Sequence, residues 1–227
     1  MKRIAIIGAG MSGLTVANQL KEIASVQIFE KSRGVSGRMS TRYAEPYQFD
    51  HGAQDFTVRD EAFKSFLTPY INAGILHEWK PRLMLLEKGQ IAKIRDWSEI
   101  HYVPVPKMNE LCIAMAKEID VNLNTEITEI EKRNQHWFLK TKDEQTFGPY
   151  EWIINTTPAP QAEKLLPASF SGNHLFKRCK MLGCYTLMLA ISQPLPWEWQ
   201  AAIVKNSLIS WMALNSNKPG RDNRQTL

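Results

Sequence analysis

The segment IAIIGAGMSG, residues 4–13, decides the fold. The apolar, β-branched residues 3–7 predict a buried strand that ends at the first of three glycines. A helix is expected from Met11, because apolar residues then recur every three or four positions, at Leu14, Ala17, Leu20 and Ala24. Residues 25–30 predict a second strand, so the chain should begin with a right-handed β–α–β crossover.

The spacing of Gly8, Gly10 and Gly13 is typical of a turn that binds a dinucleotide. The first glycine allows a tight turn, the second lets the backbone approach a pyrophosphate, and the third lets the helix pack closely on the sheet. The free N–H groups and the dipole of the helix N-terminus favour phosphate there. Glu30 ends the second strand, where a carboxylate would bind a ribose hydroxyl and repel a 2′-phosphate.

The next segment, EKSRGVSGRMSTR at residues 30–42, adds a second loop rich in glycine and arginine. A simple NAD site has no need of such a loop. It suits a longer cofactor, because its backbone N–H groups and Arg38 could meet the pyrophosphate from the other side. The segment therefore favours FAD over NAD.

Composition excludes several other classes of protein. Of the 227 residues, 44% are hydrophobic and 22% are charged, as in ordinary globular proteins. No apolar run approaches the roughly 18 residues of a membrane span, and no signal peptide is present, which predicts a cytoplasmic protein. The net charge of +5 comes without any nucleic-acid-binding motif. Cys112, Cys179 and Cys184 form no metal-binding pair and suit a reducing compartment.

The remaining pattern predicts an α/β fold with two discontinuous domains. A Rossmann-type FAD-binding domain is expected at residues 1–75 and 104–160, and a mixed β-sheet substrate domain at 76–103 and 161–227. Helices are predicted at 61–71, 107–119, 158–166 and 175–181. Strands are predicted at 47–56, 82–87, 91–97, 184–192 and 207–215, with a three-stranded meander at 121–158 and a connection at 193–200.

Three motifs together resemble a known family. GAGMSGL, FEKSRGVSGRMSTR and FDHGAQDFT are similar to segments of the renalase-like flavoproteins, a branch of the flavin-containing amine-oxidase group. Weaker similarities run onward through YVPVPKMNEL, NTEITEI, TTPAPQAEKLL and CYTLMLAISQPLPW to SLISWMALNSNKPGR, so the resemblance covers nearly the whole chain. It implies FAD bound without a covalent link, and a second domain whose sheet covers the isoalloxazine ring.

The resemblance also implies roles for particular residues, carried over by position. The pyrophosphate would lie on Gly8, Gly10, Met11, Ser12 and Gly13, and the adenosine ribose on Glu30. The diphosphate and ribityl chain would lie along Lys31, Arg38 and Met39. The flavin would lie near Gly52, Ala53, Gln54 and Asp55, the adenine near the backbone of Ile127, and the cofactor near Thr157 and Pro158.

The chain departs from the family pattern in two places. Ser36-Gly37 replaces the usual double glycine, which affects backbone freedom. Such flavoproteins also continue past the NKPGR motif into a segment with a glycine–aspartate motif, and we expect this C-terminal part to be missing here.

The sequence therefore predicts an FAD-dependent oxidoreductase that takes a hydride from a small reduced substrate, either a dihydronicotinamide or an amine, with dioxygen as a candidate oxidant. No catalytic residue is assigned, because His51, Tyr185 and Trp211 fit structural roles better. The partner would be a small molecule, with no nucleic acid or membrane, and the oligomeric state is open. Two alternatives remain: an inactive, truncated nucleotide-binding fragment, and an NAD-dependent dehydrogenase.

Overall fold

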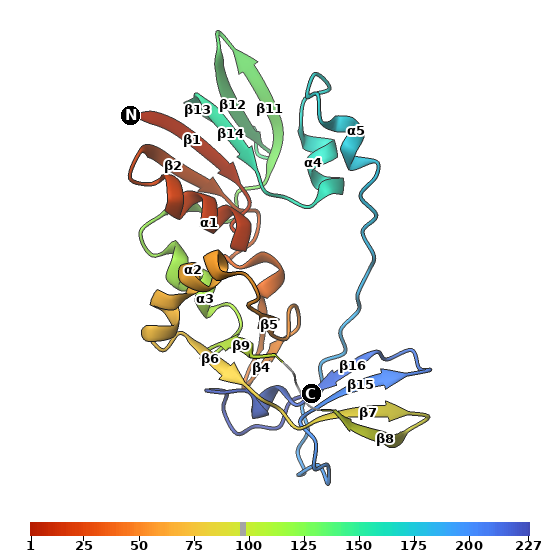
Figure 1. The fold of residues 1–227 in the computed structure, drawn as a ribbon. Helices are drawn as coiled ribbons and strands as arrows, with labels where there is room; N and C mark the ends of the chain where they lie inside the picture. Colours follow the sequence, from red (N-terminus) through yellow and green to blue (C-terminus); the bar gives the residue numbers. More distant parts are fainter. Residues whose placement is uncertain (96–98) are drawn as a thin grey trace. The chain divides into compact units, whose positions relative to one another are not determined.

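The computed structural model describes residues 1–95 and 99–227, which form two compact units (Figure 1). Unit 1 comprises Met1–Arg38 and Cys112–Tyr185, and unit 2 comprises Met39–Leu111 and Thr186–Leu227. The predicted boundaries between a cofactor domain and a substrate domain concern function, and they stay a prediction beside this division. The end of the strand predicted at 91–97 lies outside the described residues.

Unit 1 is built on a four-stranded sheet whose strands are all parallel. Its order is β10-β2-β1-β14, and its strands are β1 (Lys2–Ile7), β2 (Ala24–Phe29), β10 (Asp120–Asn122) and β14 (Trp152–Asn155). Helix α1 (Met11–Leu20) connects β1 to β2. The β–α–β crossover predicted from the first thirty residues is therefore confirmed, within one residue at each strand.

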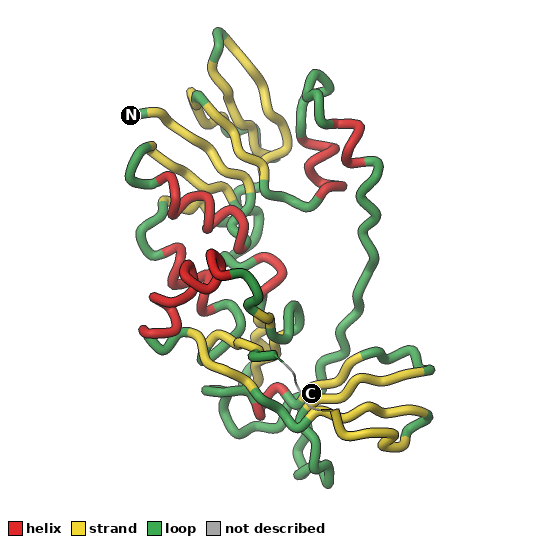
Figure 2. The backbone as a smooth tube through the Cα atoms, viewed as in Figure 1, coloured by secondary structure: helices red, strands yellow, loops and turns green. Residues whose placement is uncertain are grey.

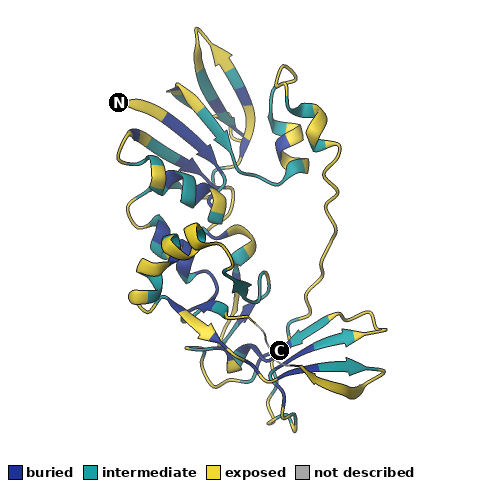
Figure 3. Cartoon of the chain, viewed as in Figure 1, coloured by how far each residue is buried: buried dark blue, intermediate teal, exposed yellow. Residues whose placement is uncertain are grey.

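Both faces of this sheet are covered, as is typical of parallel sheets. Ala5, Ile7 and Phe29 pack against the meander through Leu139 and Tyr150. The alternate residues of β1 point to the opposite face, where α1 lies with Leu14 and Ala17 fully buried (Figures 1 and 3).

The meander consists of β11 (Ile127–Arg133), β12 (His136–Thr141) and β13 (Thr146–Tyr150), paired antiparallel. The expectation that residues 150–158 supply its third strand is wrong. β13 ends at Tyr150, and β14 joins β1 as an edge strand of the parallel sheet instead. Helices α4 (Ala159–Leu165) and α5 (Asn173–Phe176) follow, so the helix predicted at 175–181 is shorter and earlier.

Unit 2 contains a hairpin of β3 (Thr41–Ala44) and β4 (Tyr47–Asp50), and a three-stranded sheet in the order β5-β9-β6. The strands of this sheet are β5 (Phe56–Thr57), β6 (Leu76–Trp79) and β9 (His101–Pro104). Helix α2 (Glu61–Asn72) begins after Asp60, whose carboxylate accepts a hydrogen bond from the Phe63 N–H. Helix α3 (Glu110–Ala116) is shorter than the predicted 107–119, and just before it the Met108 N–H donates to the carboxylate of Asp50.

The second sheet of unit 2 has the order β16-β15-β7-β8 and is mixed, with β15 parallel to β7 and the other pairs antiparallel. Its strands are β7 (Leu83–Glu87), β8 (Gln90–Arg95), β15 (Ala201–Lys205) and β16 (Trp211–Ala213). β15 was not predicted, because its short alanine-rich run gives a weak signal. The strand predicted at 184–192 is wrong: this segment is loop with one bridge, Ala190 to Thr226, and Tyr185 and Leu187 are exposed (Figure 2).

The predicted fold class is confirmed, since a parallel α/β unit and a mixed-sheet unit share the chain discontinuously. No helix within the described residues is both long and apolar enough to cross a membrane.

Candidate functional site

The glycine turn of unit 1 has the geometry that its sequence predicts. Gly8 has φ +103°, and a Cβ built there would lie 2.9 Å from Thr156 Oγ1. A Cβ on Gly13 would lie 2.0 Å from Gly8 O, so only glycine lets α1 approach the end of β1 this closely. Gly10 precedes α1 without a capping side chain, and the first turn of the helix holds no acidic residue. The helix N-terminus therefore offers uncapped N–H groups to an anion.

Glu30 lies at the end of β2 and is bound to this turn. Its carboxylate accepts hydrogen bonds from the Ala9 N–H (2.8 Å) and the Ser32 N–H (2.9 Å), and the residue is buried. Two backbone donors fix the carboxylate while leaving acceptor sites for further hydrogen bonds. An acceptor fixed beside the glycine turn is what binding of a ribose hydroxyl requires.

The second loop, residues 33–38, lies directly against the glycine turn. Ser36 forms a parallel bridge with Gly10, and its N–H donates to Ala9 O at 2.9 Å. A Cβ on Gly37 would lie 3.3 Å from Gly10 Cα. Lys31 and Arg38, which flank this contact, are exposed. The loop thus brings its backbone to the N-terminus of α1.

Ser36 adopts a strained backbone conformation. Its φ is +106°, in the region that glycine favours, and the residue is 2% exposed. This is the position at which the resembling family has a glycine, so the replacement by serine has a conformational cost.

Two further segments of unit 1 reach the same turn. Thr156 donates through Oγ1 to Ile7 O (2.9 Å), and Thr157 lies beside Gly8 while donating to Asn155 Oδ1. The N–H of Thr125 donates to Glu30 O (2.8 Å), two residues before Ile127. Most of the predicted residues belong to unit 1: Gly8, Gly10, Met11, Ser12, Gly13, Glu30, Lys31, Arg38, Ile127, Thr157 and Pro158.

The other predicted residues belong to unit 2: Met39, Gly52, Ala53, Gln54 and Asp55. Loop 52–55 connects β4 to β5. Asp55 is held by His101, with 2.5 Å between Asp55 Oδ2 and His101 Nδ1, and β5 pairs with β9 next to this contact. Sequence reasoning did not single out His101.

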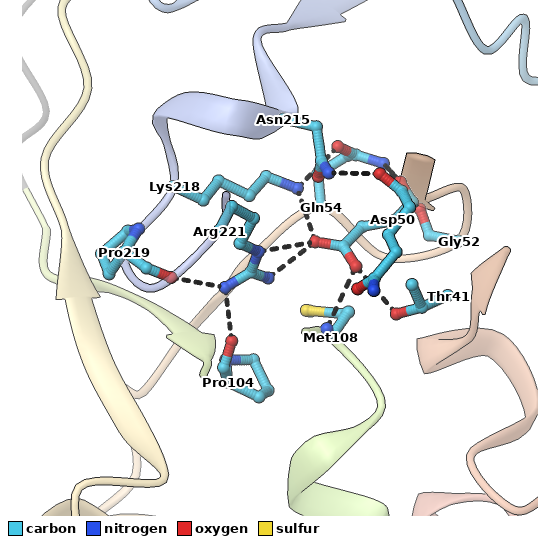
Figure 4. Close-up of polar contacts among 11 residues, drawn as sticks. Thr41, Asp50, Gly52, Gln54, Pro104, Met108, Asn215, Lys218, Pro219 and Arg221 are labelled. Atoms are coloured by element: carbon cyan, nitrogen blue, oxygen red, sulfur yellow. Dashed lines mark hydrogen bonds and ion pairs between the residues drawn. The ribbon is translucent and has the colours of Figure 1, made fainter. Parts of the chain in front are cut away.

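A buried ionic cluster stands at the other end of this loop, made of Asp50, Lys218 and Arg221 (Figure 4). Asp50 Oδ2 accepts from Arg221 Nη2 at 2.6 Å and from Lys218 Nζ at 3.4 Å, while Oδ1 accepts from Thr41 Oγ1 (2.8 Å) and the Met108 N–H (3.0 Å). The Lys218 side chain is 0% exposed and that of Asp50 is 1% exposed.

The cluster perturbs the pKa values of its members. Burial raises the pKa of Asp50, but the charges of Lys218 and Arg221 and the hydrogen bonds outweigh it, so this pKa lies below its usual value. Burial lowers the pKa of Lys218 to about 8, although the Asp50 charge opposes the shift. A cavity of about 190 Å³ adjoins the cluster, lined by Thr41, Gln48, Asp50, Pro106, Lys107, Asn215, Gly220, Arg221, Asp222 and Thr226.

Sequence reasoning quoted the NKPGR segment that holds Lys218 and Arg221, but gave these two residues no role. The sequence did carry a signal for this cluster, because Lys218 and Arg221 lie beside Gly220 in a segment that otherwise has the composition of a loop. No group of His, Cys, Asp and Glu side chains in residues 1–95 and 99–227 is placed to hold a metal ion.

Comparisons with known proteins agree with this geometry. Residues 6–69 match the family described as NAD(P)-binding Rossmann-like domain. The structure is similar to a protein from Exiguobacterium sp. 255-15 assigned as a protoporphyrinogen oxidase, with a TM-score of 0.72 and 11% identity, over 99% of this chain and 75% of that one. It is also similar to the tetracycline destructase Tet(51), with a TM-score of 0.55 and 16% identity, over 74% of this chain and 42% of that one.

The likeness to these two structures concerns the fold. Residues 6–69 match a Rossmann-like dinucleotide-binding domain, and the chain shares its fold with these two structures.

Proposed function

We propose that this protein is an FAD-dependent oxidoreductase that takes a hydride from a small reduced substrate, either a dihydronicotinamide or an amine. The observation that carries the proposal is the contact of loop 33–38 with the glycine turn, through Ser36 and Gly10. NAD needs only the first turn and Glu30, whereas a second, basic loop at the same helix N-terminus suits the longer path of FAD.

The residues present fit the cofactor. The open cradle that a Cβ at Gly8 or Gly13 would fill, and the uncapped start of α1, suit a pyrophosphate. We propose that Glu30, which already accepts from the Ala9 N–H, also accepts a hydrogen bond from the adenosine ribose, and that the exposed cations of Lys31 and Arg38 bind the diphosphate.

The bound flavin would supply the redox chemistry by accepting the hydride, with dioxygen as a candidate acceptor for its reoxidation. The chain's own part is to bind and orient: Glu30 holds the ribose, and Gly8, Gly10 and Gly13 make room for phosphate. The substrate is proposed to be a small molecule rather than a nucleic acid or a membrane surface.

The experiment is an anaerobic reduction followed by its visible spectrum. The protein is reconstituted with FAD, and reduced nicotinamides and amines are added separately. We expect one of these classes to bleach the flavin absorbance, and air to restore it with release of hydrogen peroxide. A reconstituted flavin that neither class bleaches would contradict the proposal.

A second candidate, an NAD-dependent dehydrogenase, is favoured by the family match at residues 6–69. It predicts binding of NAD with no flavin, and change in nicotinamide absorbance when an alcohol or an amine is offered.

A further inference from the structure

The cavity of about 190 Å³ beside the ionic cluster lies entirely within unit 2, because every residue that lines it belongs to that unit. Its lining runs from exposed to buried side chains. That of Asp222 is 48% exposed, whereas those of Arg221 and Asp50 are 6% and 1% exposed. Since a cavity of about 150 Å³ holds benzene, this one admits a molecule of about six to eight non-hydrogen atoms.

Arg221 has one hydrogen-bond donor left for a ligand of this cavity. A guanidinium carries five N–H groups. Four of them are used, because Nε and Nη2 donate to Asp50 while Nη1 donates to Pro104 O (2.6 Å) and Pro219 O (2.8 Å) (Figure 4). The second N–H of Nη2 has no partner in the part of the chain that the structure describes. An acceptor in the cavity would satisfy it.

The ionic cluster also carries an excess of positive charge. Two cations, Lys218 and Arg221, face the single carboxylate of Asp50, so the three groups sum to +1. Burial first, and then the charge of Arg221, lower the pKa of Lys218 to about 8, although Asp50 opposes both. The ammonium group is therefore mostly charged at neutral pH. A buried charge without compensation is unfavourable, and an anion in the adjoining cavity would offset it.

The other charged residues of the lining leave this excess in place, because each has a partner of opposite charge. Lys107 Nζ lies 3.2 Å from Glu110 Oε1, and Asp222 pairs with Arg224 at 3.2 Å. An ammonium group has three N–H donors, so Lys107 retains one after its bonds to Glu110 and Tyr43. The lining thus holds two cations that can still donate.

We propose that this cavity binds a small monocarboxylate, whose charge Arg221 and Lys107 offset and whose hydrocarbon part contacts Pro106. A monoanion matches the excess of one positive charge, and its oxygens match the donors that the two cations retain. Pro106 gives the cavity an apolar wall, which favours a hydrocarbon chain over an inorganic anion. The site goes beyond the proposed function, because its ligand does not involve a dinucleotide.

The test titrates the purified protein, without cofactor, with butyrate and with butyramide, a neutral molecule of nearly the same size. Backbone amide chemical shifts report the binding. We expect butyrate to shift the amides of Thr41, Gly220 and Thr226, which line the cavity, and to bind about tenfold more tightly than butyramide. Equal binding of the two molecules, or no shift of these amides, would overturn the inference. Inorganic phosphate is the third probe, and tighter binding of phosphate than of butyrate at these amides would overturn it too.

Two variants with opposite expected effects test the charges of the cavity. Lys107→Met should weaken butyrate binding by about tenfold, because it removes a charged donor. Asp222→Asn should tighten binding by about threefold, because it removes a charge of the same sign as the ligand. Both changes break ion pairs that are partly exposed, so both variants should stay folded.

The matched control is Lys64→Met on α2. Like Lys107, Lys64 pairs with a glutamate three positions away, here Glu61, but it does not line the cavity. Its butyrate affinity should equal that of the parent protein. If Lys107→Met bound butyrate as tightly as Lys64→Met does, or if Asp222→Asn bound it more weakly than the parent protein, the inference would be wrong.

Discussion

Replacing Asp50 by asparagine should destabilise unit 2 strongly. The change keeps the size of the side chain and an acceptor for Thr41 and Met108, but it removes the negative charge that faces Lys218 and Arg221. Removing one partner of a buried ion pair typically costs about 3–5 kcal/mol, because a charge stays buried without compensation.

The structure places the expected cost at the lower end of that range. Lys218 can lose its proton at little cost, because burial already lowers its pKa to about 8. Arg221 cannot, since a guanidinium stays charged in proteins. Its side chain is 6% exposed, and its two shortest contacts other than Asp50 are carbonyl oxygens. We therefore expect Asp50→Asn to lower the free energy of unfolding by about 3 kcal/mol at neutral pH.

Urea unfolding, followed by tryptophan fluorescence, measures this loss. Trp79 reports on unit 2, because Lys218 lies over its ring. Asp222→Asn is the control: it neutralises an exposed acid of the same region, and should change stability by less than about 1 kcal/mol. Asp50→Asn combined with Arg221→Met should cost less than the sum of the two single changes, by about 2 kcal/mol. A loss below about 1 kcal/mol for Asp50→Asn would refute the view that a tight buried pair stabilises this unit.

Three other changes test separate parts of the account. Gly13→Ala places a Cβ 2.0 Å from Gly8 O, so the free energy of unfolding of unit 1 should fall by about 3 kcal/mol and FAD binding should be lost. Urea unfolding and FAD titration measure the two effects, and a variant with normal FAD affinity would contradict this prediction. Ser36→Gly relieves a φ of +106°, so the free energy of unfolding should rise by about 1 kcal/mol and the melting temperature should rise with it. A lower melting temperature would show that the serine is not strained. Stability should rise with pH through Lys218, because its folded pKa of about 8 lies below the 10.5 of the unfolded chain, which therefore binds more protons between these values. Between about pH 7.5 and 9.5 the free energy of unfolding, measured with urea, should rise by about 2 kcal/mol. This rise should be absent in Lys218→Met. An equal dependence of stability on pH in both proteins would exclude Lys218 as its source.

The parts of the fold that sequence predicts well are those set by local physics. The glycine turn and α1 follow from three glycines and an apolar period, all within about twenty residues. Glu30 was placed correctly at the end of β2, but its bonds to the Ala9 and Ser32 N–H groups follow only from the folded turn.

The parts that sequence misses depend on distant partners. Asp50 and Lys218 are 168 residues apart, and the sequence around either residue does not indicate the other as its partner. The alternating residues 184–192 look like a strand, yet alternation does not supply a neighbouring strand, and the segment forms only one isolated bridge, from Ala190 to Thr226. Conversely, the alanine-rich β15 becomes a strand because β7 and β16 flank it.

The central claim is that the glycine turn and the loop at Ser36 together bind FAD rather than NAD. Equilibrium titration of the purified protein with each dinucleotide, under the same conditions, tests it most directly. We predict that one FAD binds per chain, with a dissociation constant at least about tenfold below that for NAD, which corresponds to about 1.4 kcal/mol. Tighter binding of NAD than of FAD would contradict the account.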